Sequence, residues 1–144
     1  MARVLDVAEY ILSRRGEMTT MKLQKLVYYC QAWSLVWESR PIFDERIEAW
    51  ANGPVVPELY NAHRGHFTVS TVGGDASALD GDSIETIGAV LEFYGDRDAQ
   101  WLGDLTHQED PWRNARRGLV PGAPSHQEIR HAELAEYYMG LVLQ

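Results

Sequence analysis

The sequence predicts a mainly α, α+β fold: one compact helical domain over residues 1–144, with five to seven helices and a small antiparallel β element. Three observations predict it. Apolar residues recur at helical spacing along most of the chain. Strand-like alternation is confined to two short segments, residues 47–51 and 67–71. A length of 144 residues suffices for one core and leaves little room for a second.

The first two helices are predicted before residue 40. The earlier one is amphipathic and ends before Gly16, after two arginines that suit a helix C-terminus. Thr19 or Thr20 can cap the later one. Apolar residues cover nearly its whole circumference, so we expect it at the centre of the core, with a partner-binding face as the alternative. The predicted buried residues are Val4, Leu5, Ala8, Ile11 and Leu12, then Leu23, Leu26, Val27, Cys30 and Trp37.

The stretch EAWANGPVVPELYNAHRG, residues 48–65, predicts a rigid corner. Residues 47–51 can form a short strand. Gly53 must then leave the helical region, because Pro54 restricts the residue before it. Pro57 suits the first position of a helix, and the glycine that closes the stretch suits a left-handed helix end. The corner is therefore predicted as strand, turn and short helix.

Beyond the corner, residues 67–71 alternate in a way that allows a small antiparallel pairing. The segment from Gly73 to Gly81 is rich in small residues and aspartate, which predicts a mobile loop.

Four helices are predicted after that loop. Their expected starts are Asp82 with Glu85, Asp98, Asp110 with Pro111, and Ser125 with Glu128 as a capping box. Gly95 should end the first of them, and the third should run through Arg116. The apolar stripes comprise Ile84, Ile87, Leu91 and Tyr94, then Trp101, Leu102 and Leu105, and finally Ile129, Leu134, Tyr137, Tyr138 and Leu141.

The charge of the chain argues against some classes of binding partner. The net charge of −8 argues against nucleic acid, because binding to phosphates depends on Lys and Arg. The only compact basic cluster, Arg113, Arg116 and Arg117, is interpreted as helix C-terminal charge. Residues 75–110 carry ten acidic residues against one arginine, which forms either a solvated face or a surface that steers a basic protein.

The chain lacks an apolar run of membrane-spanning length and a signal-peptide pattern, so we expect a cytoplasmic protein with no membrane partner. A single cysteine allows no internal disulfide. The oligomeric state is left open.

Five histidines and one cysteine prompt a search for chemistry. Their spacing fits no metal site, and nothing indicates a cofactor. Cys30 lies on a buried stripe, where a cysteine behaves as a small hydrophobe. The segment GDLTHQEDPW, residues 103–112, is the best remaining candidate. It is either a hydrogen-bonded corner, in which Thr, His and Asp satisfy backbone groups, or a site with His107 as general base.

Three segments, in order and spacing, resemble the SocA-like antitoxin domain, also called Panacea: MKLQKLVYYCQAW, IEAWANGPVVPELY and LTHQEDPWRNAR. Asn52 departs from the pattern, because many members carry an aromatic residue before Gly-Pro-Val, and residues 66–81 match nothing in the family. The motif positions are Lys22, Leu23, Lys25, Leu26, Tyr28, Gly53, Val55, Leu105, Thr106, His107, Glu109, Pro111 and Trp112.

The resemblance implies a non-enzymatic antitoxin, of bacterial or phage origin, that neutralises a cognate protein toxin by direct contact. An alternative is a proteolytic adaptor that delivers the toxin to a AAA+ protease. A different class is a small hydrolase or transferase that uses His107. The expected toxin-binding residues are Trp33, Trp37, Trp50, Asn52, Pro54, Tyr60 and His63. The Gly53–Pro54 corner would hold Trp50 and Tyr60 in a fixed relation and lower the ordering cost of binding, or else it packs the β element against the helices.

Overall fold

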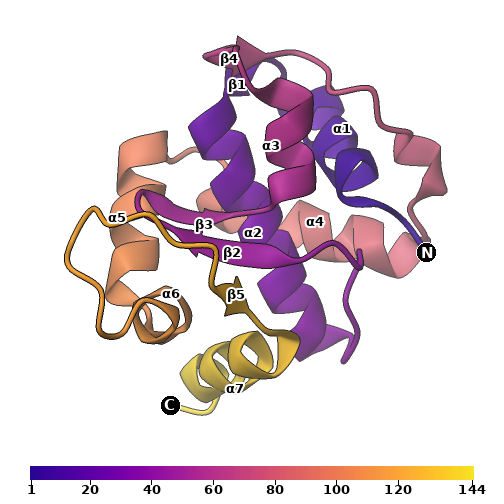
Figure 1. Cartoon of the computed structure of the whole chain (residues 1–144). Coiled ribbons are helices and arrows are strands. Elements are labelled where there is room, and N and C mark those ends of the chain that lie inside the picture. The colour runs from indigo at the N-terminus through magenta and orange to yellow at the C-terminus, as the bar shows by residue number, and fades with distance from the viewer.

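The structure, a computed structural model, describes residues 1–144 and confirms the mainly α, α+β class. Seven helices and two small antiparallel sheets surround one core of 30 buried hydrophobic residues. The helix α2, Thr20–Trp37, runs through the middle of this arrangement (Figure 1). Around it pack α1 (Val4–Arg15), α4 (Gly81–Tyr94), α5 (Ala99–Gln108) and α7 (His131–Val142).

The central position predicted for α2 is confirmed, because 13 of its 18 residues are buried. Thr19 caps it, and its hydroxyl accepts a hydrogen bond from the backbone N–H of Lys22 at 3.2 Å. The stripe prediction is wrong for Trp37, which is 48% exposed. Its ring stacks on that of Trp33, with centroids 5.1 Å apart, at the end of the helix instead of entering the core.

A three-stranded sheet lies against the helices with strand order β3-β2-β5. It consists of β2 (Ile47–Trp50), β3 (Gly53–Val55) and β5 (Glu128–Ile129). Ala49 pairs with Pro54, and Ile47 pairs with Ile129. The Gly53–Pro54 turn that was predicted is thus the start of a strand, reached after a tight connection.

The predicted strands at 47–51 and 67–71 both exist, but they lie in different sheets. The two-stranded sheet joins β1 (Met18–Thr19) to β4 (Thr68–Val69), just before α2 begins. Between the sheets, α3 (Pro57–His63) starts with a proline, as predicted, and Gly65 follows it with a φ of 89°.

The loop that follows is fastened to α1, in contrast to the mobile loop predicted. One carboxylate oxygen of Glu9 accepts hydrogen bonds from the backbone N–H groups of Val72, Gly73 and Gly74. A short 3₁₀ turn, η1 (Ala76–Ala78), packs beside α1. The sequence pattern missed this because the anchoring carboxylate lies some sixty residues upstream.

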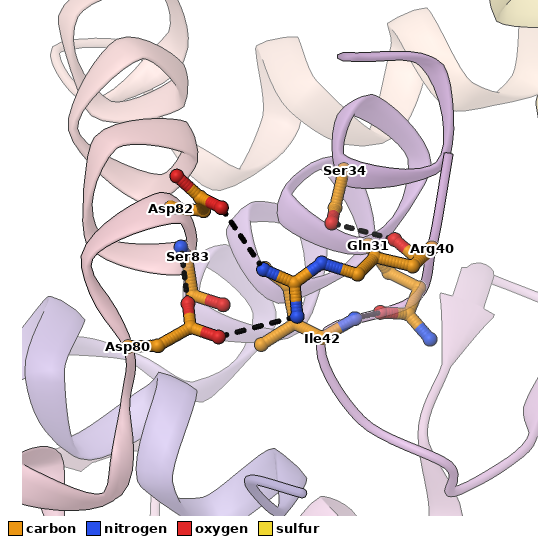
Figure 2. A network of polar contacts seen from close by, with 7 residues as sticks. All are labelled: Gln31, Ser34, Arg40, Ile42, Asp80, Asp82 and Ser83. Atoms are coloured by element: carbon orange, nitrogen blue, oxygen red, sulfur yellow. Dashed lines mark hydrogen bonds and ion pairs between the residues drawn. The ribbon is translucent and has the colours of Figure 1, made fainter. Parts of the chain in front are cut away.

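A polar network joins the end of α2 to the start of α4 (Figure 2). Arg40 forms ion pairs with Asp80 at 3.2 Å and Asp82 at 3.3 Å. Asp80 caps α4 by accepting from the backbone N–H of Ser83, so the predicted cap at Asp82 is wrong by two residues. Asp82 is instead available to the arginine. Gly95 ends α4 as predicted, but Ile84 lies partly exposed, outside the buried stripe.

Asp98 caps α5 as predicted, by accepting from the backbone N–H of Trp101. The brief helix α6, Asp110–Ala115, has Glu109 as its N-cap, so the predicted cap at Asp110 is wrong by one residue. The predicted capping box of Ser125 and Glu128 does not form, because residues 128–129 pair with β2 and α7 begins later.

Arg116 is buried and does not act as exposed helix-end charge. Its guanidinium donates to the carbonyl oxygens of Ala49 at 3.1 Å and Ala123 at 2.8 Å, and it lies over the ring of Trp112. It therefore ties the C-terminal loop to the three-stranded sheet. None of the seven helices combines the length and the hydropathy needed to cross a membrane.

Candidate partner-binding surfaces

The corner at β2, β3 and α3 brings the rings of Trp50 and Tyr60 together, with centroids 5.0 Å apart and planes at 64°. Both ends of Trp50 are fixed. Its indole N–H donates to Glu48 at 2.9 Å, and its carbonyl oxygen accepts from the indole N–H of Trp112 at 2.8 Å. Trp50 is half-buried, whereas Tyr60 is 36% exposed. The corner therefore presents an edge of a pre-ordered aromatic pair.

The other predicted residues of this corner have different environments. Asn52 is exposed at the β2–β3 connection. Pro54 is buried in β3, and His63 is only 4% exposed. The imidazole Nε2 of His63 lies 3.0 Å from Nε2 of Gln24. Nε2 of Gln24 also donates to the carbonyl oxygen of Val56, and its Oε1 accepts from the backbone N–H of Val56. Pro54 and His63 thus pack the corner and offer no surface to a partner.

Three family-motif residues meet beneath the corner. Lys25 from α2 is fully buried, and its Nζ forms no hydrogen bond. It faces Gly53, where a β-carbon would lie 2.6 Å from Lys25 Cε and 3.4 Å from the hydroxyl of Thr106. Burial lowers the pKa of Lys25 to about 8. The motif therefore marks a close approach of α2, β3 and α5.

The segment 103–112 is only partly the hydrogen-bonded corner that was predicted. The hydroxyl of Thr106 donates to the carbonyl oxygen of Gly103 at 2.7 Å. His107 instead stacks on Trp112, with ring centroids 4.0 Å apart, and its Nε2 is buried without a partner. No carboxylate orients this imidazole as a general base would require. Nor do any three His, Cys, Asp or Glu side chains group in a metal-binding arrangement.

Cys30 is fully buried, as predicted, and burial raises the pKa of its thiol. A thiol in that environment stays protonated and is a poor nucleophile.

Glu109 forms a buried network with tyrosines that sequence reasoning missed. Its Oε1 accepts from the hydroxyls of Tyr29 and Tyr138, each at 2.7 Å. Because the Tyr138 proton points to Glu109, the hydroxyl of Tyr28, 3.1 Å from that of Tyr138, donates in turn. Burial raises the pKa of Glu109, and the two hydrogen bonds oppose that shift. The carboxylate is thereby held in one orientation.

A large apolar cleft opens between α2, α4, α5 and α7, here called the aromatic cleft. Its volume is about 660 Å³, and ten of its eleven lining residues are hydrophobic. Glu109 is the exception. The rings that line it are Trp33, Trp37, Phe93, Tyr94 and Trp101. Phe93 is 71% exposed. An open apolar surface of this kind marks a binding site more often than a bare solvent face.

The expected toxin-binding residues thus separate into two regions. Trp33 and Trp37 line the aromatic cleft, whereas Trp50, Asn52 and Tyr60 lie at the β2–β3 corner. No ring–ring contact joins the two groups. Sequence reasoning missed Phe93 and Trp101 as surface residues. The helical periodicity could have identified Phe93, because its position in α4 falls outside the buried stripe.

Comparison with protein families matches residues 23–113 to the model described as "Antitoxin SocA-like, Panacea domain". These residues include most of α2, the β2–β3 corner, α4 and α5, and most of α6. Comparison with curated proteins and with solved structures gave no significant match.

Proposed function

Since this chain belongs to the SocA-like antitoxin family, with a Panacea domain over residues 23–113, we propose that it neutralises a cognate protein toxin by binding it directly. The observation that carries the proposal is the aromatic cleft, where exposed apolar rings surround a single carboxylate. Trp and Tyr are the side chains that most often dominate interface energies. The acidic segment 75–110 would add long-range attraction for a basic partner.

The β2–β3 corner is the second surface that we propose for toxin binding. Trp50 is held by hydrogen bonds at both ends and packs on Tyr60, so little side-chain freedom is lost on binding. Asn52 lies exposed beside this pair and can contribute to partner choice.

Co-expression with the product of the neighbouring reading frame tests the proposal. We expect the wild-type chain to restore growth, and Trp37→Ala and Tyr60→Ala each to weaken the rescue and the affinity measured by titration calorimetry. Phe67→Ala is a matched control, because Phe67 is a 78% exposed ring outside both surfaces. Unchanged melting temperatures must accompany the losses. Full rescue by a variant that carries both substitutions would overturn the proposed surfaces.

His107→Ala separates binding from catalysis. Rescue should persist in this variant when the protein remains folded. Loss of rescue with unchanged toxin affinity would instead support the hydrolase or transferase alternative.

The separation of the two surfaces also favours a second candidate, the proteolytic adaptor, because an adaptor must hold toxin and protease at once. In that case the toxin level would fall only in cells that contain the AAA+ protease. Under sequestration the toxin level stays constant and its activity is lost. An immunoblot of tagged toxin in protease-deficient cells distinguishes the two mechanisms.

A further inference from the structure

We infer that the aromatic cleft binds a short amphipathic helix with basic flanks, and that one Lys or Arg of its apolar face pairs with Glu109. The inference rests on the proposed function, because the helix is taken to be a segment of the toxin. It adds the chemistry of that segment and the residue that recognises it.

The walls of the cleft are suited to the apolar face of a helix. Trp33 and Trp37 are spaced i, i+4 on α2, and Trp101 and Leu105 are spaced i, i+4 on α5. The volume of about 660 Å³ can receive several side chains at once, and the cleft remains open to solvent along Phe93 and Val142. A helix places side chains i, i+3, i+4 and i+7 into such a groove.

The carboxylate of Glu109, which lines the cleft, favours a positively charged group in the ligand. Glu109 is 6% exposed and lines the cleft, and its Oε1 is fully engaged by Tyr29 and Tyr138. Both hydrogen bonds that Glu109 accepts go to Oε1, and its side chain makes no cap hydrogen bond to α6, so Oε2 is the acceptor left for a ligand. An ammonium or guanidinium group is the partner that a carboxylate among apolar walls favours most.

The surrounding rings also favour a cation. Arg97 already lies over the ring of Trp101 with its guanidinium carbon 4.4 Å from the ring centroid. The indole ring of Trp37 and the phenyl ring of Phe93 also line the cleft. Cations are attracted to such faces, most strongly to Trp. A Lys or Arg that enters here would therefore meet a carboxylate and aromatic faces together.

The charge outside the cleft selects a basic partner over a second copy of this chain. The segment 75–110 supplies α4 and α5 as two walls of the cleft and carries ten acidic residues against Arg97 alone. Two copies with a net charge of −8 each would repel one another. A helix with Lys or Arg beside its apolar stripe would be attracted and aligned.

Selection from a displayed library tests the inference even while the toxin is unidentified. The library encodes helices of about 14 residues, some four turns, with the apolar stripe varied and one central stripe position fully randomised. Wild-type protein is the bait, and Phe93→Ser protein removes clones that do not use the cleft. We expect Lys or Arg at the central position in the selected clones. Neutral or acidic residues there would overturn the inference.

Titration of the best selected peptide then tests Glu109 itself, with indole fluorescence as the readout. Replacing the central basic residue by norleucine should weaken binding to the wild type about tenfold. It should have little effect on binding to Glu109→Gln, which keeps the Tyr29 and Tyr138 hydrogen bonds and lacks the charge. Tyr60→Ala, at the other surface, should bind like the wild type. The inference would be overturned if the norleucine replacement weakened binding to Glu109→Gln as much as binding to the wild type. It would also be overturned if, of the two protein variants, only Tyr60→Ala bound the peptide more weakly than the wild type.

The result is separable from the proposed function. Growth rescue with no cleft-dependent peptide would leave the antitoxin function intact and refute only the basic helix. Self-association through the cleft, detected by sedimentation and abolished by Phe93→Ser, would likewise refute it. Cleft-dependent basic peptides without rescue would refute the toxin as the source of the helix, and with it the inference as stated.

Discussion

Lys25 fills the space that a side chain at position 53 would need: a β-carbon on Gly53 would lie 2.6 Å from Lys25 Cε. Gly53 also has a φ of 128°, which L-residues rarely adopt. Lys25 is fully buried, so its side-chain end would have to shift within the interior to make space.

Replacing Gly53 by Ala should therefore lower the free energy of unfolding by about 2–4 kcal/mol. Urea denaturation measures it. Gly65→Ala is the matched control, because Gly65 has a φ of 89° but open space around it, and should lose only the backbone term of about 1 kcal/mol. Equal losses at both positions would show that the contact with Lys25 contributes nothing.

Lys25 should make stability depend on pH. Its pKa is lowered from 10.5 to about 8, so between these values the unfolded chain binds more protons than the folded one, and stability rises with pH. Tyrosines of the unfolded chain lose their proton near pH 10, whereas burial raises the pKa of Tyr94 in the folded chain to about 12. Above about pH 10 the folded chain therefore binds more protons, and stability falls with pH. The rise should therefore appear between about pH 8 and 9.5.

Lys25→Met tests this directly, because methionine can fill similar space without a charge. The variant should be more stable than the wild type at neutral pH and should lack the rise. Denaturant midpoints at several pH values provide the measurement. A rise of the same size in the variant would assign it to another group.

Glu109→Ala should destabilise the fold more than Glu109→Gln. Alanine leaves the buried hydroxyls of Tyr29 and Tyr138 without an acceptor, at a cost of about 2–4 kcal/mol in the free energy of unfolding. Glutamine keeps an acceptor. Because the folded-state pKa of Glu109 is raised, its contribution to stability falls as the pH rises above 4.5, and that slope should vanish in both variants. Thermal denaturation from acidic to neutral pH measures both effects.

Arg116→Ala should lower the free energy of unfolding by about 2–4 kcal/mol, because two carbonyl oxygens lose a charged, buried donor. Arg117→Ala should change it by less than about 0.5 kcal/mol, since Arg117 is exposed and bonds only Asn114. Calorimetric melting of the pair checks this. Similar losses for both arginines would contradict the role given to Arg116.

Local signals in the sequence predicted most of the helices, and the errors came from long-range pairing. Thr19 and Asp98 cap their helices as expected, because a cap contacts residues three positions ahead. Ser125 failed because Ile129 pairs with Ile47, a choice that no window around residue 125 contains. Because of this pairing, Glu128 and Ile129 form a strand, although they were expected in a helix.

The candidate site was predictable only in part for the same reason. Trp37 and Tyr60 could be proposed from residue type alone, since Trp and Tyr suit interfaces, but the exposure of Trp37 was not predicted. The setting of Glu109 could not, because its tyrosine partners lie 80 and 29 residues away in sequence. The cleft itself exists only where four helices meet, so periodicity within one helix could not reveal it.

The arrangement around α2 also separates residues that tolerate substitution from residues that do not. Leu23, Lys25, Leu26 and Tyr28 of the family motif are sealed inside, where almost any exchange disturbs packing. The outermost rings of the cleft, Trp37, Phe93 and Trp101, lie outside the motif and can be exchanged with little damage to the interior. Under the proposed function, a lineage could therefore recognise new toxins by changing the side chains of one rim while keeping the same scaffold.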